Sequence, residues 1–193
     1  MNTTMNIEDL FPLSDDEKKD ALNDDGLELN EGFLFNEKNF NTIILQSKES
    51  QDNQQKKQIL DVEKFIQQYN NISEKNDLLL WLKQNNFKHL LTDQIQSITD
   101  EKLLTPLICA YWEAGFDDWN DLLIFIPHLV SNNLSIALEA RSAIEGLARP
   151  FKEDDVHQAL QIIESKYDQL STEVRYLVDD IVELLKSELS SNE

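Results

Sequence analysis

An internal repeat of apolar residues constrains the fold of this chain more than any other feature of its sequence. When the sequence is shifted along itself by 33 or 34 residues, apolar positions of one segment fall on apolar positions of a later one. The matched segments are 103–114 with 136–147, 122–129 with 156–163, and 140–148 with 174–182. Their apolar residues recur at helical spacing, which is typical of amphipathic helices. Three matches at nearly the same shift favour a repeated pair of helices.

The same periodicity predicts helices over most of the chain after residue 58. Three apolar stripes lie within 62–69, 78–82 and 87–95. Five further helices are expected at roughly 101–114, 119–131, 134–148, 154–168 and 172–189. Because the chain has only four glycines and four prolines, connections should be short and successive helices antiparallel neighbours. The sequence therefore predicts an all-α fold, either an antiparallel helix-pair repeat or an irregular helical bundle.

The segment 137–148 carries a motif that accompanies this period. It contains several small residues, Arg141 and a late Leu147. In these features it resembles the first helix of a HEAT-like repeat, and the resemblance covers at most about residues 100–189. It does not resemble a tetratricopeptide repeat, whose Trp, Gly-Tyr and Pro landmarks are missing here. The resemblance implies an α-solenoid that acts as a scaffold or adaptor for proteins or peptides, and it assigns no catalytic residue.

The first 57 residues differ from the rest in composition, because polar residues dominate and apolar residues form small islands. Such islands bury too little area to offset the entropy of ordering the chain. We therefore expect a flexible, largely disordered acidic segment at 1–57 and a helical domain at 58–193. Two interpretations of the islands stay open. They are isolated apolar points of a disordered tail or dock weakly on the protein's own helices, or they are linear motifs, with Ile7, Leu10 and Phe11 fitting a groove and 41–45 adding a strand to a partner's sheet.

The formal charge of −20 at pH 7 bears on the choice of partner. Binding to a phosphate backbone requires clustered Lys and Arg, so a direct nucleic-acid ligand is disfavoured. The same charge attracts basic partners at long range. Cys109 is the single cysteine, no basic and apolar leader is recognisable, and no apolar run reaches the ~20 residues of a membrane span. We expect a cytoplasmic protein without membrane insertion.

No set of residues in the sequence predicts catalysis, a cofactor or a metal. One cysteine and three histidines cannot supply the close ligand pairs of a structural zinc site. Cys109 is expected to pack as a small apolar residue, because nothing nearby in sequence lowers the pKa of its thiol. His128 is expected to cap a carbonyl freed by Pro127 or to line a groove between helices.

The densest cluster of aromatic and acidic residues lies within 111–121. In one interpretation Gly115 ends a helix in a left-handed conformation and Asp117 or Asp118 caps the next. In the other, the cluster anchors an Arg- or Lys-bearing segment through cation–π and charge-assisted contacts, with Trp112 inside and Trp119 outside. The candidate partner-binding residues here are Trp112, Phe116, Asp117, Asp118 and Trp119.

A small basic island contributes two more candidates, Arg141 and Arg149. Glu145 stands four residues after Arg141, so an intrahelical ion pair accounts for part of the island. Alternatively, the two arginines hold the acidic N-terminal segment or a partner's carboxylate.

Together these features predict a non-catalytic protein–protein interaction module, an adaptor or scaffold that uses a groove between successive helices, with Trp112, Phe116 and Trp119 near its rim. Linear motifs in the N-terminal segment are a further binding element. The alternative is an acidic inhibitor or chaperone that occupies the basic surface of a nucleic-acid-binding or other cationic protein, and an enzyme ranks third.

Overall fold

The computed structural model describes residues 40–46 and 58–190, all of which belong to one compact unit, Asn36–Glu193. The described part contains eight α-helices and two short strands. The elements are η2 (Asn41–Ile43), β1 (Ile44–Gln46), β2 (Gln58–Leu60), α3 (Val62–Tyr69), α4 (Ile72–Gln84), α5 (Lys88–Ser97), α6 (Glu101–Glu113), η3 (Trp119–Asp121), α7 (Leu122–Leu129), α8 (Leu134–Gly146), α9 (Glu153–Tyr167) and α10 (Thr172–Ser190).

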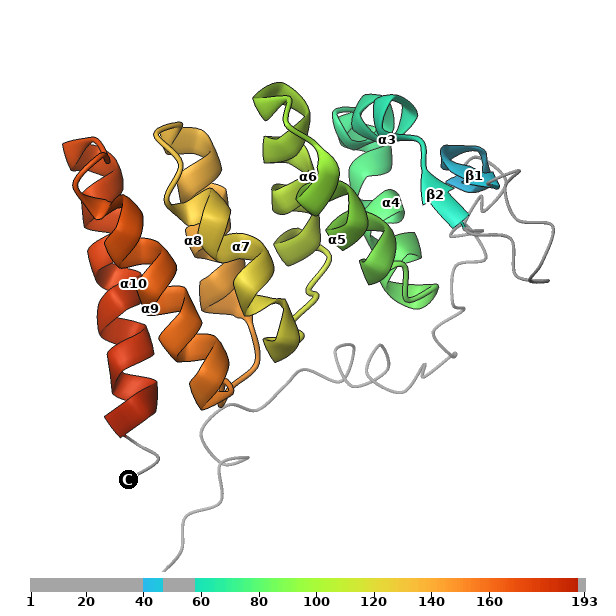
Figure 1. The fold of residues 1–193 in the computed structure, drawn as a ribbon. Helices are drawn as coiled ribbons and strands as arrows, with labels where there is room; N and C mark the ends of the chain where they lie inside the picture. Colours follow the sequence, from blue (N-terminus) through green and yellow to red (C-terminus); the bar gives the residue numbers. More distant parts are fainter. Residues whose placement is uncertain (1–39, 47–57, 191–193) are drawn as a thin grey trace, which may run out of the picture. The chain divides into compact units, whose positions relative to one another are not determined.

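From α5 onward the helices form two layers. In one layer α6 contacts α8 and α8 contacts α10, and in the other α5 contacts α7 and α7 contacts α9. Consecutive helices pair across the layers, as α5 with α6, α7 with α8 and α9 with α10 (Figure 1). The connection within each of these pairs is short, so the second helix packs back on the first.

The predicted all-α fold is confirmed in the described residues, and the five predicted C-terminal helices correspond to α6 through α10. Four of them agree with the prediction to within two residues at each end. The exception is the helix predicted at 119–131, which is a short 3-10 helix followed by α7. The finer choice between a HEAT-like α-solenoid and an irregular helical bundle stays a prediction.

Small residues at the centre of the unit explain how the helices approach one another closely. Helix α8 packs against α6, α7 and α10, and its Ala137, Ala140 and Ala143 are fully buried. Short side chains let neighbouring helix axes come near. Larger side chains, including Trp81 and Phe125, fill the remaining core.

Polar residues set where several helices begin. The side chains of Asp61, Asn71, Asp100 and Asn133 each accept a hydrogen bond from a backbone N–H in the first turn of the helix that follows. Such caps satisfy donors that the helix itself leaves unpaired. None of the helices in the described part is long and apolar enough to cross a membrane.

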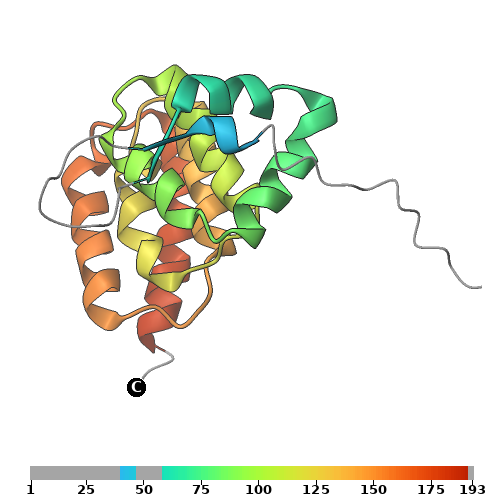
Figure 2. The ribbon, with the colours of Figure 1, turned by 90° about the vertical axis from the view of Figure 1, so that its right-hand side faces the viewer.

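Residues 40–46 pack on the helices at the α3–α5 end of the unit (Figures 1 and 2). Strand β1 pairs antiparallel with β2, with Ile44 opposite Leu60. Phe40 and Ile43 are buried, and the ring of Phe40 lies 5.7 Å from that of Trp81 between centroids. The structure therefore shows that the apolar island at 41–45 docks on the protein's own helices.

The rest of the predicted acidic segment, 1–39 and 47–57, lies outside the described residues. The disorder that we predict there stays a prediction. The same holds for the linear motif formed by Ile7, Leu10 and Phe11.

Candidate functional site

The aromatic and acidic corner between α6 and α7 corresponds to the cluster at 111–121, and Gly115 and Asp118 determine its backbone geometry. Gly115 ends α6 with a φ of 70°, a left-handed conformation that favours glycine. Asp118 caps the following 3-10 helix, because its side chain accepts a hydrogen bond from the backbone N–H of Asn120. Both predicted local roles are confirmed.

Ion pairs within the chain already satisfy two acids of this corner, Asp118 and Asp121. The ammonium of Lys88 lies 2.6 Å from a carboxylate oxygen of Asp118 and 2.8 Å from one of Asp121. The hydroxyl of Tyr111 donates to Asp121 at 2.6 Å. The hydrogen bond from Lys88 lowers the pKa of Asp118 to about 2, so this carboxylate is charged and paired at neutral pH.

The aromatic face of the corner is also covered by the chain itself. The ammonium of Lys152 lies 4.3 Å from the centroid of the Trp119 ring, in the position that a partner's cation would take. A hollow of about 410 Å³ remains beside it, lined by Phe116, Asp117, Asp118 and Trp119. The structure thus brings together four of the seven candidate residues, but the Asp118 carboxylate and the Trp119 face already have internal partners.

The other three candidate residues lie elsewhere. Trp112 is 36% exposed, so the expectation that it lies inside is wrong, and its Nε1 donates to Glu139 of α8 at 2.8 Å. At about 100° per residue, position 112 lies at the edge of the buried face of α6, which is centred on Leu104, Leu107 and Tyr111. Trp112 therefore joins α6 to α8 and does not belong to the corner.

The two arginines reach α10. Arg141 forms the predicted intrahelical pair with Glu145 at 3.0 Å and a second pair with Asp180 at 3.0 Å. Arg149 lies 3.8 Å from Glu188. Each arginine therefore has a carboxylate of α10 beside it in the described structure.

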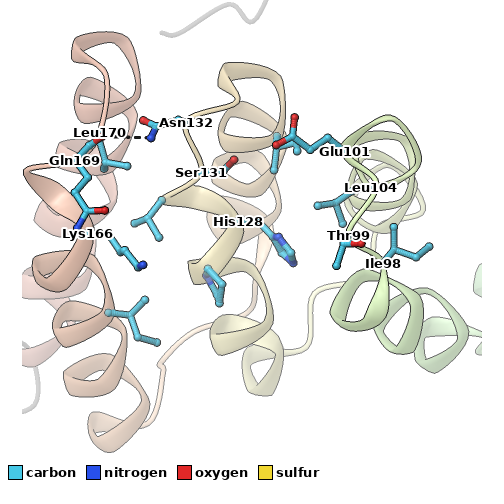
Figure 3. A pocket seen from close by; sticks show the side chains of 14 residues that line it. Ile98, Thr99, Glu101, Leu104, His128, Ser131, Asn132, Lys166, Gln169 and Leu170 are labelled. Carbon is cyan, nitrogen blue, oxygen red and sulfur yellow. Dashed lines mark hydrogen bonds between the residues drawn. The ribbon is translucent and has the colours of Figure 1, made fainter.

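A groove with a volume of about 500 Å³ lies between helices of successive pairs (Figure 3). Its side chains come from the α5–α6 connection, α6, α7, the α7–α8 connection, α8, α9 and the α9–α10 connection. Seven of them are apolar, namely Ile98, Leu104, Pro127, Val130, Ile136, Ile162 and Leu170. The other seven are polar or charged, namely Thr99, Glu101, His128, Ser131, Asn132, Lys166 and Gln169. This is the size and the mixture of surfaces expected of a binding site.

The turn between α7 and α8 is fixed on both sides, which keeps the groove in shape. Asn132 donates to the carbonyl of Gln169 at 3.2 Å and accepts from the backbone N–H of Ser171 at 3.1 Å. The neighbouring Asn133 donates to Glu101 at 2.8 Å while it caps α8. A site held in this way loses little entropy when a ligand binds.

His128 points into this groove between α7 and the α5–α6 connection (Figure 3). Burial lowers the pKa of its ring, and a hydrogen bond to the backbone of Ile95 opposes that effect. The imidazole is thus neutral at pH 7. The prediction that His128 lines a groove between helices is confirmed, whereas no feature of the sequence indicated the groove residues contributed by α9. Trp112, Phe116 and Trp119, which we expected near the rim of the binding groove, do not line it.

Cys109 is half-buried on α6. Burial is the main cause that raises the pKa of its thiol to about 12, so the reactive thiolate is absent at neutral pH. Within residues 40–46 and 58–190, no group of three or more His, Cys, Asp or Glu side chains is placed to hold a metal ion.

Comparison with protein-family models, with curated proteins and with solved structures gives no match to this chain. The functional assignment therefore depends on the geometry described above.

Proposed function

We propose that this protein is a non-catalytic protein–protein interaction module, an adaptor or scaffold that binds a peptide segment of its partner in the groove beside His128. The observation that carries the proposal is the composition of that groove, with an apolar floor, a polar rim and a fixed turn at Asn132. An apolar floor supplies the binding free energy, and polar groups at the rim orient the ligand.

The groove is suited to an extended or helical segment because it runs across more than one helix pair. Ile98 and Leu104 border it on one side, and Ile162 and Leu170 border it on the other. Glu101 and Lys166 stand at these two sides and offer opposite charges to a ligand that spans them. A segment with apolar side chains and a charge at each end would match this pattern.

A HEAT-like α-solenoid is the architecture that we propose for this module. Support comes from the two layers, α6–α8–α10 and α5–α7–α9, in which each helix contacts the corresponding helix of the next pair. In a solenoid each unit covers one face of its neighbour and leaves grooves between units. A cytoplasmic location is part of the same proposal.

The test is affinity capture of partners with the full chain and three variants. Ile162→Glu places a charge on the apolar floor of the groove, at a half-buried side chain. Ile72→Glu is the matched control, because Ile72 is 92% exposed on α4 and does not line the groove. Washes at high salt shorten the Debye length to about 3 Å and remove partners held by surface charge alone.

We expect a partner that survives the high-salt wash with the full chain and with Ile72→Glu and is lost with Ile162→Glu. Pro127→Glu, at an exposed position of the same groove, should have the same effect without removing a packed side chain. Capture that is equal for all four proteins would refute the groove as the binding site.

A further inference from the structure

The α6–α8–α10 layer presents an exposed apolar side chain on each of its three helices. Trp112 on α6 is 36% exposed, Leu138 on α8 is 46% exposed and Tyr176 on α10 is 68% exposed. Helix α8 contacts both of the others, so the three lie on adjacent helices (Figure 1). Single apolar side chains on a surface are ordinary, but a group on neighbouring elements marks an interaction surface.

A carboxylate lies beside Trp112, where α6 meets α8, and makes this part of the surface negative. Trp112 donates to the carboxylate of Glu139 at 2.8 Å, and Glu139 forms no ion pair within the described residues. Burial is the largest cause that raises the pKa of the nearby Cys109 thiol, and the negative charges of Glu139 and Glu113 raise it further. Glu113 is paired with Lys75 at 2.8 Å, so among the described residues the carboxylate of Glu139 is the one that leaves negative charge without a cationic partner beside the exposed indole edge.

A contact across α8 and α10 continues the surface. Because a helix turns by about 100° per residue, Leu138 lies on the outer line of α8, between the α6 side and the α10 side. Arg141 lies about one turn after Leu138 on α8 and forms an ion pair with Asp180 of α10 at 3.0 Å. Asp180 in turn stands four residues after Tyr176, so the two are neighbours on the surface of α10.

The balance of charge on this layer determines which partner it fits. Helices α6, α8 and α10 together carry nine carboxylates and four basic side chains. Arg141 is already shared between Glu145 and Asp180. Exposed carboxylates such as Glu173 and Glu183 flank Tyr176 on α10. Aromatic rings rimmed by carboxylates bind cationic side chains by cation–π and charge-assisted contacts.

We propose that the α6–α8–α10 surface, defined by Trp112, Leu138 and Tyr176, is a second interaction site, which binds a basic and apolar segment of a partner protein. Arg or Lys side chains of the segment lie against Tyr176 and the carboxylates beside it, and an apolar side chain packs on Leu138. This site does not depend on the groove beside His128, because its three defining side chains do not line that groove.

The test measures the binding of labelled synthetic peptides to the full chain by fluorescence anisotropy. The probe is a peptide of Arg and Leu residues. One comparison peptide has Glu in place of every Arg, and the other has Ser in place of every Leu. The double variant Leu138→Ser with Tyr176→Ala removes two exposed side chains and leaves the core intact. Ile72→Ser is the control, an exposed apolar residue removed from another helix.

We expect the Arg–Leu peptide to bind the full chain and the Ile72→Ser control equally. The double variant should bind it about tenfold more weakly, the loss typical of side chains central to an interface. The Glu peptide should not bind, and the Ser peptide should bind more weakly. Unchanged binding in the double variant would show attraction to the overall negative charge only and would overturn the proposal, as would an absence of binding.

Discussion

Buried polar contacts at single residues decide how rigid the corner between α6 and α7 is. Asp121 is 6% exposed, and it holds both the ammonium of Lys88 and the hydroxyl of Tyr111. Because burial of a carboxylate is costly unless it is paired, these contacts account for its place in the core. They also join η3 to the start of α5 and to α6.

Replacing Asp121 by Ala should destabilise the protein by about 1–3 kcal/mol, because the buried hydroxyl of Tyr111 loses its acceptor. Lys88 keeps Asp118 as a partner, which limits the loss. Asp117→Ala, at an exposed acid of the same corner, should change stability by less than about 0.5 kcal/mol. Urea unfolding followed by circular dichroism measures both, and equal effects of the two substitutions would contradict this role for Asp121.

The Asp118–Lys88 pair predicts a dependence of stability on pH. Lys88 lowers the pKa of Asp118 to about 2 in the folded protein, below the value of about 3.9 in an unfolded chain. The pair therefore stabilises the fold above about pH 4, and that contribution is lost as the pH falls toward 2. Asp118→Asn keeps a good capping residue and removes the charge.

We therefore expect the native protein to be more stable than Asp118→Asn at neutral pH and equal to it near pH 2. The measurement is the unfolding free energy of both proteins across this range. A difference that stays constant with pH would show that the ion pair does not contribute.

At the scale of helices and strands, the positions and lengths of the helices were easier to predict from the sequence than the contacts between them. Apolar periodicity predicted α6, α8, α9 and α10, because in each of them buried apolar residues recur at helical spacing over a dozen or more residues. The corner was predictable because Gly115 and Asp118 act through local backbone geometry. Lys152 over Trp119 and Trp112 beside Glu139 were not, since residues far apart in sequence form those contacts.

A groove between helices was predicted, but most of the residues that line it were not, for the same reason. Leu104 and Leu170 are ordinary apolar positions in the sequence, and only the stacking of helix pairs makes them border one hollow. His128 was the single signal, because a histidine beside a proline in an apolar helix calls for an explanation.

Two glycines at helix ends should respond oppositely to the same substitution. Gly115→Ala puts a β-carbon on a residue at φ 70° and within 3.3 Å of the Lys83 ammonium, and it should cost about 1–2 kcal/mol. Gly146 is in the last turn of α8 with nothing within 4 Å of a β-carbon. Gly146→Ala should therefore be neutral or stabilise by up to about 1 kcal/mol. Thermal unfolding compares them, and the same sign for both would contradict the assigned backbone conformations.

The short segment 40–46 should stabilise the helices that it covers. Ile43 is fully buried, whereas Leu45, two residues later, is 47% exposed. Ile43→Ala should cost about 2–4 kcal/mol, and Leu45→Ala less than about 1 kcal/mol. Urea unfolding of the full chain gives both values. Equal and small losses would mean that the segment does not pack on α3 and α4 in solution.

For the whole molecule, the two proposed sites are separate surfaces, because Trp112, Leu138 and Tyr176 do not line the groove beside His128. The groove has an apolar floor and both charges at its rim, and the α6–α8–α10 surface has exposed rings among carboxylates. The two proposals together imply that the protein holds two partners at once. This is the property that distinguishes an adaptor from an acidic inhibitor that covers one basic site.

Hydrogen exchange of the full chain, with and without the partner captured at high salt, tests binding in the groove most directly. We predict slower amide exchange in the segments that border the groove, 98–104, 127–136 and 162–170, and no slowing in the same segments for Ile162→Glu mixed with that partner. Protection that leaves these three segments unchanged and falls on other parts of the chain would contradict the account.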